Sequence, residues 1–185
     1  ARTAKVIASE RNISAKEKML VELAFTDSLT GVRNRRSFDE FIDAVIHNEA
    51  PYNILGILMC DINGLKKIND YYGHTSGDAI LRDFSYSINS LLPDGASVYR
   101  IGGDEFVATI PNITNEQLEL LCKDIFNIPK MSEVDEYSVA IGVRLYNSAH
   151  SKDIITLIKE ADKAMYECKA RMKEGEMDPV CKTAE

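Results

Sequence analysis

The sequence predicts an α+β fold, an α/β sandwich in which helices flank a central sheet of about five strands, mixed and mostly antiparallel. Two observations lead to this prediction. Apolar segments with helical spacing alternate along the chain with strand-like segments. Two of the strands meet at a Gly-Gly turn, which is typical of an antiparallel hairpin. The predicted order is helix, helix, strand, helix, two strands, helix, strand, helix.

The composition bounds the class of protein. Of the 185 residues, 45% are hydrophobic and 28% are charged, as in soluble globular domains. The formal net charge of −7 argues against nucleic-acid binding. No apolar run approaches the roughly 20 residues that span a bilayer, so we expect no membrane contact by this segment. The four cysteines have neither metal nor disulfide spacing, which favours reduced thiols and a cytoplasmic location.

The first part of the chain is expected to form a helix over residues 4–26, with Val6, Ile13 and Leu20 at heptad spacing. Two interpretations stay open: a helix that docks on its own domain, or a connector from an upstream domain. The turn residues from Asp27 to Gly31 should end it. We therefore divide the chain into a connector helix (1–26), one domain (27–175) and a polar tail (176–185). The first residue, Ala1, hints at a fragment of a longer protein, such as the cytoplasmic part of a membrane-anchored sensor.

The remaining elements follow from periodicity. Residues 54–60 are apolar throughout, which predicts a strand buried on both faces. Alternation over 137–145 predicts a half-buried strand. Thr114 followed by Gln117 is a capping box that opens a helix. Helical spacing predicts helices over about residues 35–47, from Ile80 to Leu91, from Thr114 to Ile125 and from Ile154 to Met165.

The hairpin over 97–110 is the centre of the predicted site. It turns at Gly102 and Gly103, because glycine accepts the positive φ that tight hairpin turns require. The turn presents Asp104 and Glu105, and Asp61 follows the buried strand. Carboxylates that converge from two strand ends suit Mg²⁺, which binds a few carboxylates together with a substrate's phosphates. If it stood alone, a turn of this kind would more simply carry solvated surface acids.

Five motifs, in order, resemble the bacterial diguanylate cyclases named after Gly-Gly-Asp-Glu-Phe, and they span about residues 25–173. The resemblance implies condensation of two GTP molecules into cyclic di-GMP and two pyrophosphates, with Mg²⁺ or Mn²⁺. It also implies a fold similar to adenylyl cyclases and polymerase palm domains, and an upstream sensor domain. Each domain of the family holds one GTP, so catalysis implies a homodimer that holds the two substrates in line. The motifs are Asp27–Arg35, Asp61–Asn69, His74–Asp78, Arg100–Phe106 and Ala161–Lys169.

The resemblance assigns roles by position. Asp61, the Ile62 carbonyl and Asp104 would hold the metals. Asp104 would activate the 3′-hydroxyl, and Glu105 would support the site. Other residues would read the guanine edge or take the β- and γ-phosphates. These GTP-binding positions are Gly64, Leu65, Lys66, Asn69, His74, Asp78, Gly103, Lys169 and Lys173.

The chain also departs from the family pattern. Lys173 stands where an Arg is usual, so it keeps the charge but loses the bidentate fork. Pro93 and Ala96 replace the Arg and Asp of the family's inhibitory site, which predicts no such site here. Asn63 and Leu65 replace a usual Asp and Phe. The alternative function is a catalytically weak domain that binds GTP and regulates a partner; a related nucleotide cyclase or polymerase is a third interpretation.

Overall fold

The central strand of the fold is β2 (Ile54–Asn63), of which every residue except the two terminal ones is buried. The computed structural model describes residues 24–47, 49, 52–131, 137–149 and 153–175. The apolar run at the start of β2 lets the strand lie between two layers of helices, so its prediction as a strand buried on both faces is confirmed.

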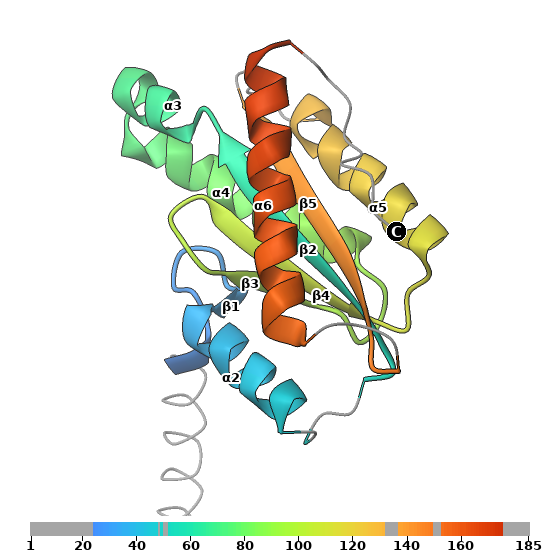
Figure 1. The fold of residues 1–185 in the computed structure, drawn as a ribbon. Coiled ribbons are helices and arrows are strands. Elements are labelled where there is room, and N and C mark those ends of the chain that lie inside the picture. Colours follow the sequence, from blue (N-terminus) through green and yellow to red (C-terminus); the bar gives the residue numbers. More distant parts are fainter. Residues whose placement is uncertain (1–23, 48, 50–51, 132–136, 150–152, 176–185) are drawn as a thin grey trace, which may run out of the picture.

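Five strands form one sheet in the order β1-β3-β4-β2-β5 (Figure 1). β3 (Ser97–Arg100) and β4 (Glu105–Pro111) form the predicted hairpin, and β2 pairs antiparallel with both β4 and β5 (Ser138–Asn147). β1 (Arg33–Asn34) pairs parallel with β3. The predicted α+β class with a mixed, mostly antiparallel sheet is therefore confirmed.

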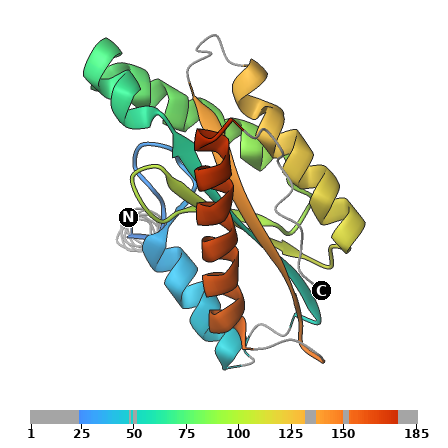
Figure 2. The same cartoon turned by 45° about the horizontal axis from the view of Figure 1, so that its top comes forward.

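Helices cover both faces of the sheet (Figures 1 and 2). α2 (Arg35–Ile46) and α6 (Ile154–Lys173) pack on the face to which Leu55, Ile57 and Met59 point. α3 (Leu65–Tyr72), α4 (His74–Leu91) and α5 (Asn115–Asn127) lie on the opposite face, and a short 3₁₀ helix (Ile128–Met131) follows α5. Because side chains alternate along a strand, Asp61 belongs to the α6 face.

The backbone of α6 comes closest to the sheet at Gly142 of β5. A Cβ atom built there would collide with backbone atoms of Ala161 and Met165, both in α6. Any side chain at this position would hold the helix away from β5. Gly142 therefore sets the height of α6 above the sheet.

Most predicted elements are confirmed, including the capping box in which Thr114 and Gln117 bond each other's backbone at the start of α5. β1 and α3 were not predicted. The prediction of a half-buried β5 is wrong over residues 139–143, which are buried because α5 and α6 pack on the strand. The predicted helix over 4–26 and the tail over 176–185 lie largely or wholly outside the described residues; Ala24 and Phe25 are helical, and Thr26 bridges to Arg33.

Two further expectations concern the core and the membrane. Cys60, Cys122 and Cys168 are reduced and buried, as predicted, and burial raises the pKa of the Cys60 thiol well above its usual value. Within the described part of the chain, no helix has the length and apolar character needed to cross a bilayer.

Candidate active site

Three acidic residues of the predicted site, Asp61, Asp104 and Glu105, lie at one end of the β2–β4 pair. Asp61 lies directly opposite Glu105 in the antiparallel ladder, so both side chains point to the α6 face. The amide of Ile62 donates to the backbone carbonyl of Asp104 at 3.0 Å. The expectation that the hairpin acids lie beside the end of β2 is thus confirmed.

Asp61 is buried and is neutralised from the last helix. Its carboxylate oxygens accept from Nζ of Lys169 at 2.7 and 2.8 Å. Like charges directly opposite in a sheet destabilise it, so the Lys169 ammonium offsets the repulsion between Asp61 and Glu105. The sequence analysis named Asp61 and Lys169 as site residues but did not predict that they would be in contact.

The turn of the hairpin is held by backbone and guanidinium contacts. The amides of Ile101 and Gly102 both donate to the carbonyl of Glu105, at 2.9 and 3.3 Å. The prediction that the two glycines supply a positive φ to the turn is wrong, because neither Gly102 nor Gly103 has one. A Cβ on Gly102 would displace the side chain of Glu105, whereas a Cβ on Gly103 would meet nothing within 4 Å.

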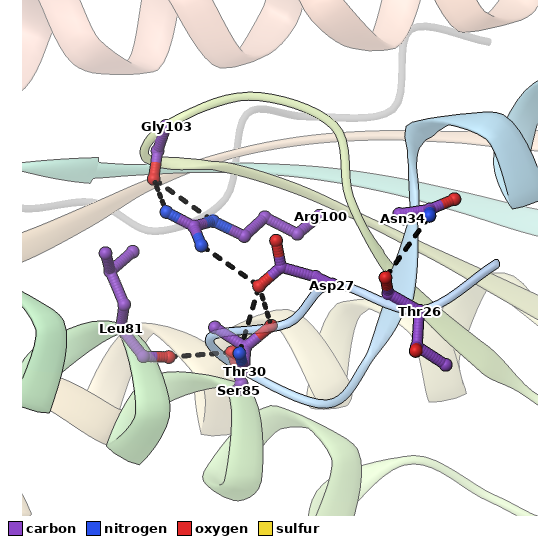
Figure 3. Close-up of polar contacts among 8 residues, drawn as sticks. All are labelled: Thr26, Asp27, Thr30, Asn34, Leu81, Ser85, Arg100 and Gly103. Atoms are coloured by element: carbon purple, nitrogen blue, oxygen red, sulfur yellow. Dashed lines mark hydrogen bonds and ion pairs between the residues drawn. The ribbon is translucent and has the colours of Figure 1, made fainter. Parts of the chain in front are cut away.

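Arg100 joins this turn to the start of the domain (Figure 3). Its Nε and Nη2 donate to the Gly103 carbonyl at 3.2 and 2.6 Å. Its Nη1 donates to Oδ1 of Asp27 at 3.0 Å, and the two side chains are only 13% and 22% exposed. One guanidinium therefore fixes the residue next to Asp104 to the segment where the predicted connector helix ends.

Asp27 also organises its own turn. Its Oδ1 accepts from the amide of Thr30 at 2.9 Å and from the Thr30 hydroxyl at 2.7 Å. Burial works to raise the pKa of Asp27, but the hydrogen bonds from Thr30 and Arg100 outweigh it and hold the pKa below 3.8. Asp27 and Arg100 lie inside recognised motifs, but nothing in the spacing indicated that they would pair.

The predicted guanine-reading residues lie at the corner between α3 and α4. Gly73, with φ of +87°, joins the two helices. Gly77 of α4 has no room for a Cβ, because the amide group of Asn69 packs against it. The side-chain oxygen Oδ1 of Asn69 is buried and has no hydrogen-bond partner among the described residues.

The other residues predicted to bind GTP lie on α3, α4 and α6 or directly before α3. Gly64, with φ of +85°, and Leu65 form the start of α3 directly after β2. The side chains of Lys66, His74 and Lys173 are exposed, and Asp78 is half-buried. Their roles toward GTP stay predictions.

Asn63, one of the departures, has a structural contact. Its Nδ2 lies 3.2 Å from Oγ of Ser138 and 3.6 Å from Sδ of Met172. It therefore links the end of β2 to β5 and to the last turn of α6.

The predicted metal ligands are oxygen donors. Among the described residues, no three His, Cys, Asp or Glu side chains gather as a metal site. The predicted set is instead Asp61, Asp104 and the Ile62 carbonyl, all hard oxygen donors. Such a set fits Mg²⁺ or Mn²⁺ when phosphate oxygens complete the coordination.

Comparison with known proteins defines the class. The family model described as "Diguanylate cyclase, GGDEF domain" matches residues 24–175. The chain belongs to the GGDEF family. The coiled coil and GGDEF domain of DgcB from Caulobacter crescentus, solved in complex with c-di-GMP, superposes with a TM-score of 0.82 at 21% identity, covering 96% of this chain and 95% of that one. The GGDEF domain of PA1120 (TpbB or YfiN) from Pseudomonas aeruginosa is 30% identical with a TM-score of 0.66, covering 79% of this chain and 89% of that one.

Two curated relatives are longer proteins. The cyclic di-GMP phosphodiesterase PdeR of Escherichia coli K12 is 37% identical over 160 residues, which cover 84% of this chain and 24% of that protein. The uncharacterized membrane protein SERP0413 of Staphylococcus epidermidis is 32% identical over 166 residues, 84% of this chain and 46% of that protein. The chain thus spans about a quarter of the length of one relative and about half of the length of the other.

Proposed function

We propose that this GGDEF domain is a diguanylate cyclase, which condenses two GTP molecules into cyclic di-GMP and two pyrophosphates as a homodimer. The observation that carries the proposal is the junction of β2 and β4, where the Ile62–Asp104 backbone bond and the Asp61–Glu105 pairing place the backbones of three acidic residues at one end of the sheet. GTP is the proposed substrate because Asn69 and Asp78 stand at the guanine-reading positions of the family.

The divalent ions, Mg²⁺ or Mn²⁺, would supply charge neutralisation at the α-phosphate and acidify the attacking 3′-hydroxyl. Asp61, Asp104 and the Ile62 carbonyl would hold them. Asp104 would accept the proton of the 3′-hydroxyl, and Glu105 would keep the site anionic beside it. The turn bonds of Ile101, Gly102 and Arg100 hold these acids in place before substrate arrives, which reduces reorganisation during the reaction.

The remaining contacts would orient the nucleotide. The Oδ1 of Asn69 would accept from the guanine edge, with Asp78 and His74 beside it. The backbone of Gly64 and Leu65, at the positive end of α3, would face the phosphates, together with Lys66, Lys169 and Lys173. Each domain would hold one GTP, and a second copy would present the other in line.

The test is product formation by a forced dimer. Residues 1–23 are replaced by a strong parallel coiled coil, and the protein is incubated with GTP and Mn²⁺ while cyclic di-GMP is followed by chromatography. We expect product, and a specific activity above that of the unfused chain at equal concentration. Asp61→Asn is the control, expected to fold but to form no product, because an amide is a poorer ligand for a hard cation than a carboxylate.

The alternative is a GTP-binding domain that regulates a partner without turnover. It is supported by the relative PdeR, which is named a phosphodiesterase although it matches a GGDEF domain here. GTP binding by the forced dimer without any product would favour this alternative over the cyclase.

A further inference from the structure

Lys169 reaches across to Asp61 from the last turns of α6. Its Nζ contacts both carboxylate oxygens, at 2.7 and 2.8 Å. Charge-assisted contacts of this length are strong ones. They engage the same carboxylate that the proposed function gives to the metal.

Asp61 requires a positive neighbour. Its side chain is 8% exposed, and Glu105 is its directly opposite residue on β4. A buried charge without a partner is costly, and a like charge opposite adds to the cost. Either an ammonium or a divalent cation can meet the requirement. The two cannot both hold the same pair of oxygens, because they repel each other and need the same space.

Lys169 can leave this contact without moving the helix. The backbone of α6 is fixed against Gly142, but the lysine side chain is 29% exposed and ends a flexible four-carbon stem. Rotation of that stem would carry the ammonium away from Asp61, toward the phosphates of a bound nucleotide.

We propose that Lys169 and a divalent cation compete for Asp61, so that binding of the cation releases the Lys169 ammonium to the phosphates of the nucleotide. The inference rests on the proposed function and deepens it, since it gives Lys169 a second contact before substrate binds. It follows that the cation increases the affinity for the nucleotide. The nucleotide increases the affinity for the cation by the same factor, because the two affinities share one coupling free energy.

The test is Mn²⁺ binding in the absence of nucleotide, measured by electron paramagnetic resonance. Lys169→Met removes the competitor, so we expect Mn²⁺ to bind about tenfold more tightly than to the wild type, which corresponds to about 1.4 kcal/mol. Lys169→Arg keeps a cation against Asp61 and should stay near the wild type. Lys163→Met is the matched control: it removes one positive charge from the same helix, where exposed Lys163 pairs with Glu167, and should not change the affinity.

The second readout is GTP affinity in the presence of Mn²⁺. In Lys169→Met it should fall while Mn²⁺ affinity without nucleotide rises. If Lys169 only stabilised the fold, its replacement would lower both the GTP affinity and the Mn²⁺ affinity. Thermal unfolding monitored by circular dichroism checks the fold, and Lys169→Gln, which can hydrogen-bond to Asp61, replaces the Met variant if that one does not fold.

Equal or weaker Mn²⁺ binding by the variant overturns the inference, and so does absence of Mn²⁺ binding by both proteins. If the wild-type dimer still forms cyclic di-GMP in either case, the proposed function stands without the competition. If no product forms, both fail.

Discussion

At the scale of single residues, the site depends on charges that are placed by partners far away in the sequence. Arg100 is the clearest case, because one guanidinium bonds Gly103 beside the acidic turn and Asp27 at the start of the domain. A lysine could make one of these contacts but not the planar fork that makes both. This side chain therefore ties the turn to the first segment, in addition to the pairing of β1 with β3.

Asp27 should make the stability of the domain depend on pH. Its pKa is lowered in the folded protein, so its contribution is fully present above 3.8, the ordinary value, and is lost as the pH falls through the depressed value. Asp27→Asn should lose about 1.5–3 kcal/mol at neutral pH, since it leaves Arg100 without its anionic partner. Urea unfolding at pH 7 and at pH 3 measures both effects. A variant whose deficit is as large at pH 3 as at pH 7 would contradict the assignment.

Gly77 should matter more for GTP than for folding. A Cβ at this position would displace the side chain of Asn69, which can rotate away. We therefore expect Gly77→Ala to cost little stability, because alanine also favours the helix, and to weaken GTP binding at least tenfold. Calorimetric titration with GTP measures the loss. The control is Ala79→Gly, on the exposed side of α4, which tests whether any substitution in the helix weakens GTP binding. Gly73→Ala is unsuitable as a control, because Gly73 has a positive φ.

At the scale of elements, α6 carries Lys169 to the sheet, and its approach depends on Gly142. Gly142→Ala would drive a methyl group into backbone atoms of the helix, which cannot rotate away as a side chain can. We expect destabilisation of about 3 kcal/mol, at the upper end for overpacking. Gly103→Ala is the matched control for stability, because its Cβ meets nothing within 4 Å. Thermal unfolding of the two variants should separate them clearly; equal losses would count against this packing role.

The elements that could be predicted are those with a strong local signal. β2 has a continuous apolar run, α5 a capping box and α4 a long apolar stripe, so each was found. α3 was missed because it is eight residues long and buries only Leu65 and Ile68. β1, with two residues, has no periodicity to detect. The acids of the site could be identified from the motifs. The Asp27–Arg100 and Asp61–Lys169 contacts could not, because they depend on how distant elements pack, which no local pattern encodes.

At the scale of the whole molecule, the turn over residues 93–96 bears on product control. Gly95 has a φ of +84° and the amide of Ala96 donates to the Pro93 carbonyl at 3.1 Å, so the expected tight turn is confirmed. Neither Pro93 nor Ala96 offers the charge that would hold a nucleotide phosphate. We expect no tight noncompetitive inhibition by cyclic di-GMP.

Initial rates of the forced dimer with added cyclic di-GMP test this expectation. Pro93→Arg together with Ala96→Asp is the comparison, in which inhibition should be stronger if the position is the right one. Strong noncompetitive inhibition of the unchanged sequence would show that product binds at another surface.

The Asp61–Lys169 contact joins residues that are 108 positions apart, and this separation bears on how the domain folds. Closing so long a loop costs entropy that only the docking of α6 repays, which places the contact among the late events of folding. During translation Asp61 and Glu105 leave the ribosome well before α6 does. The nascent domain therefore carries an unneutralised pair of acids on an exposed sheet face until its last helix arrives, and the binding site comes into existence only with the completed fold.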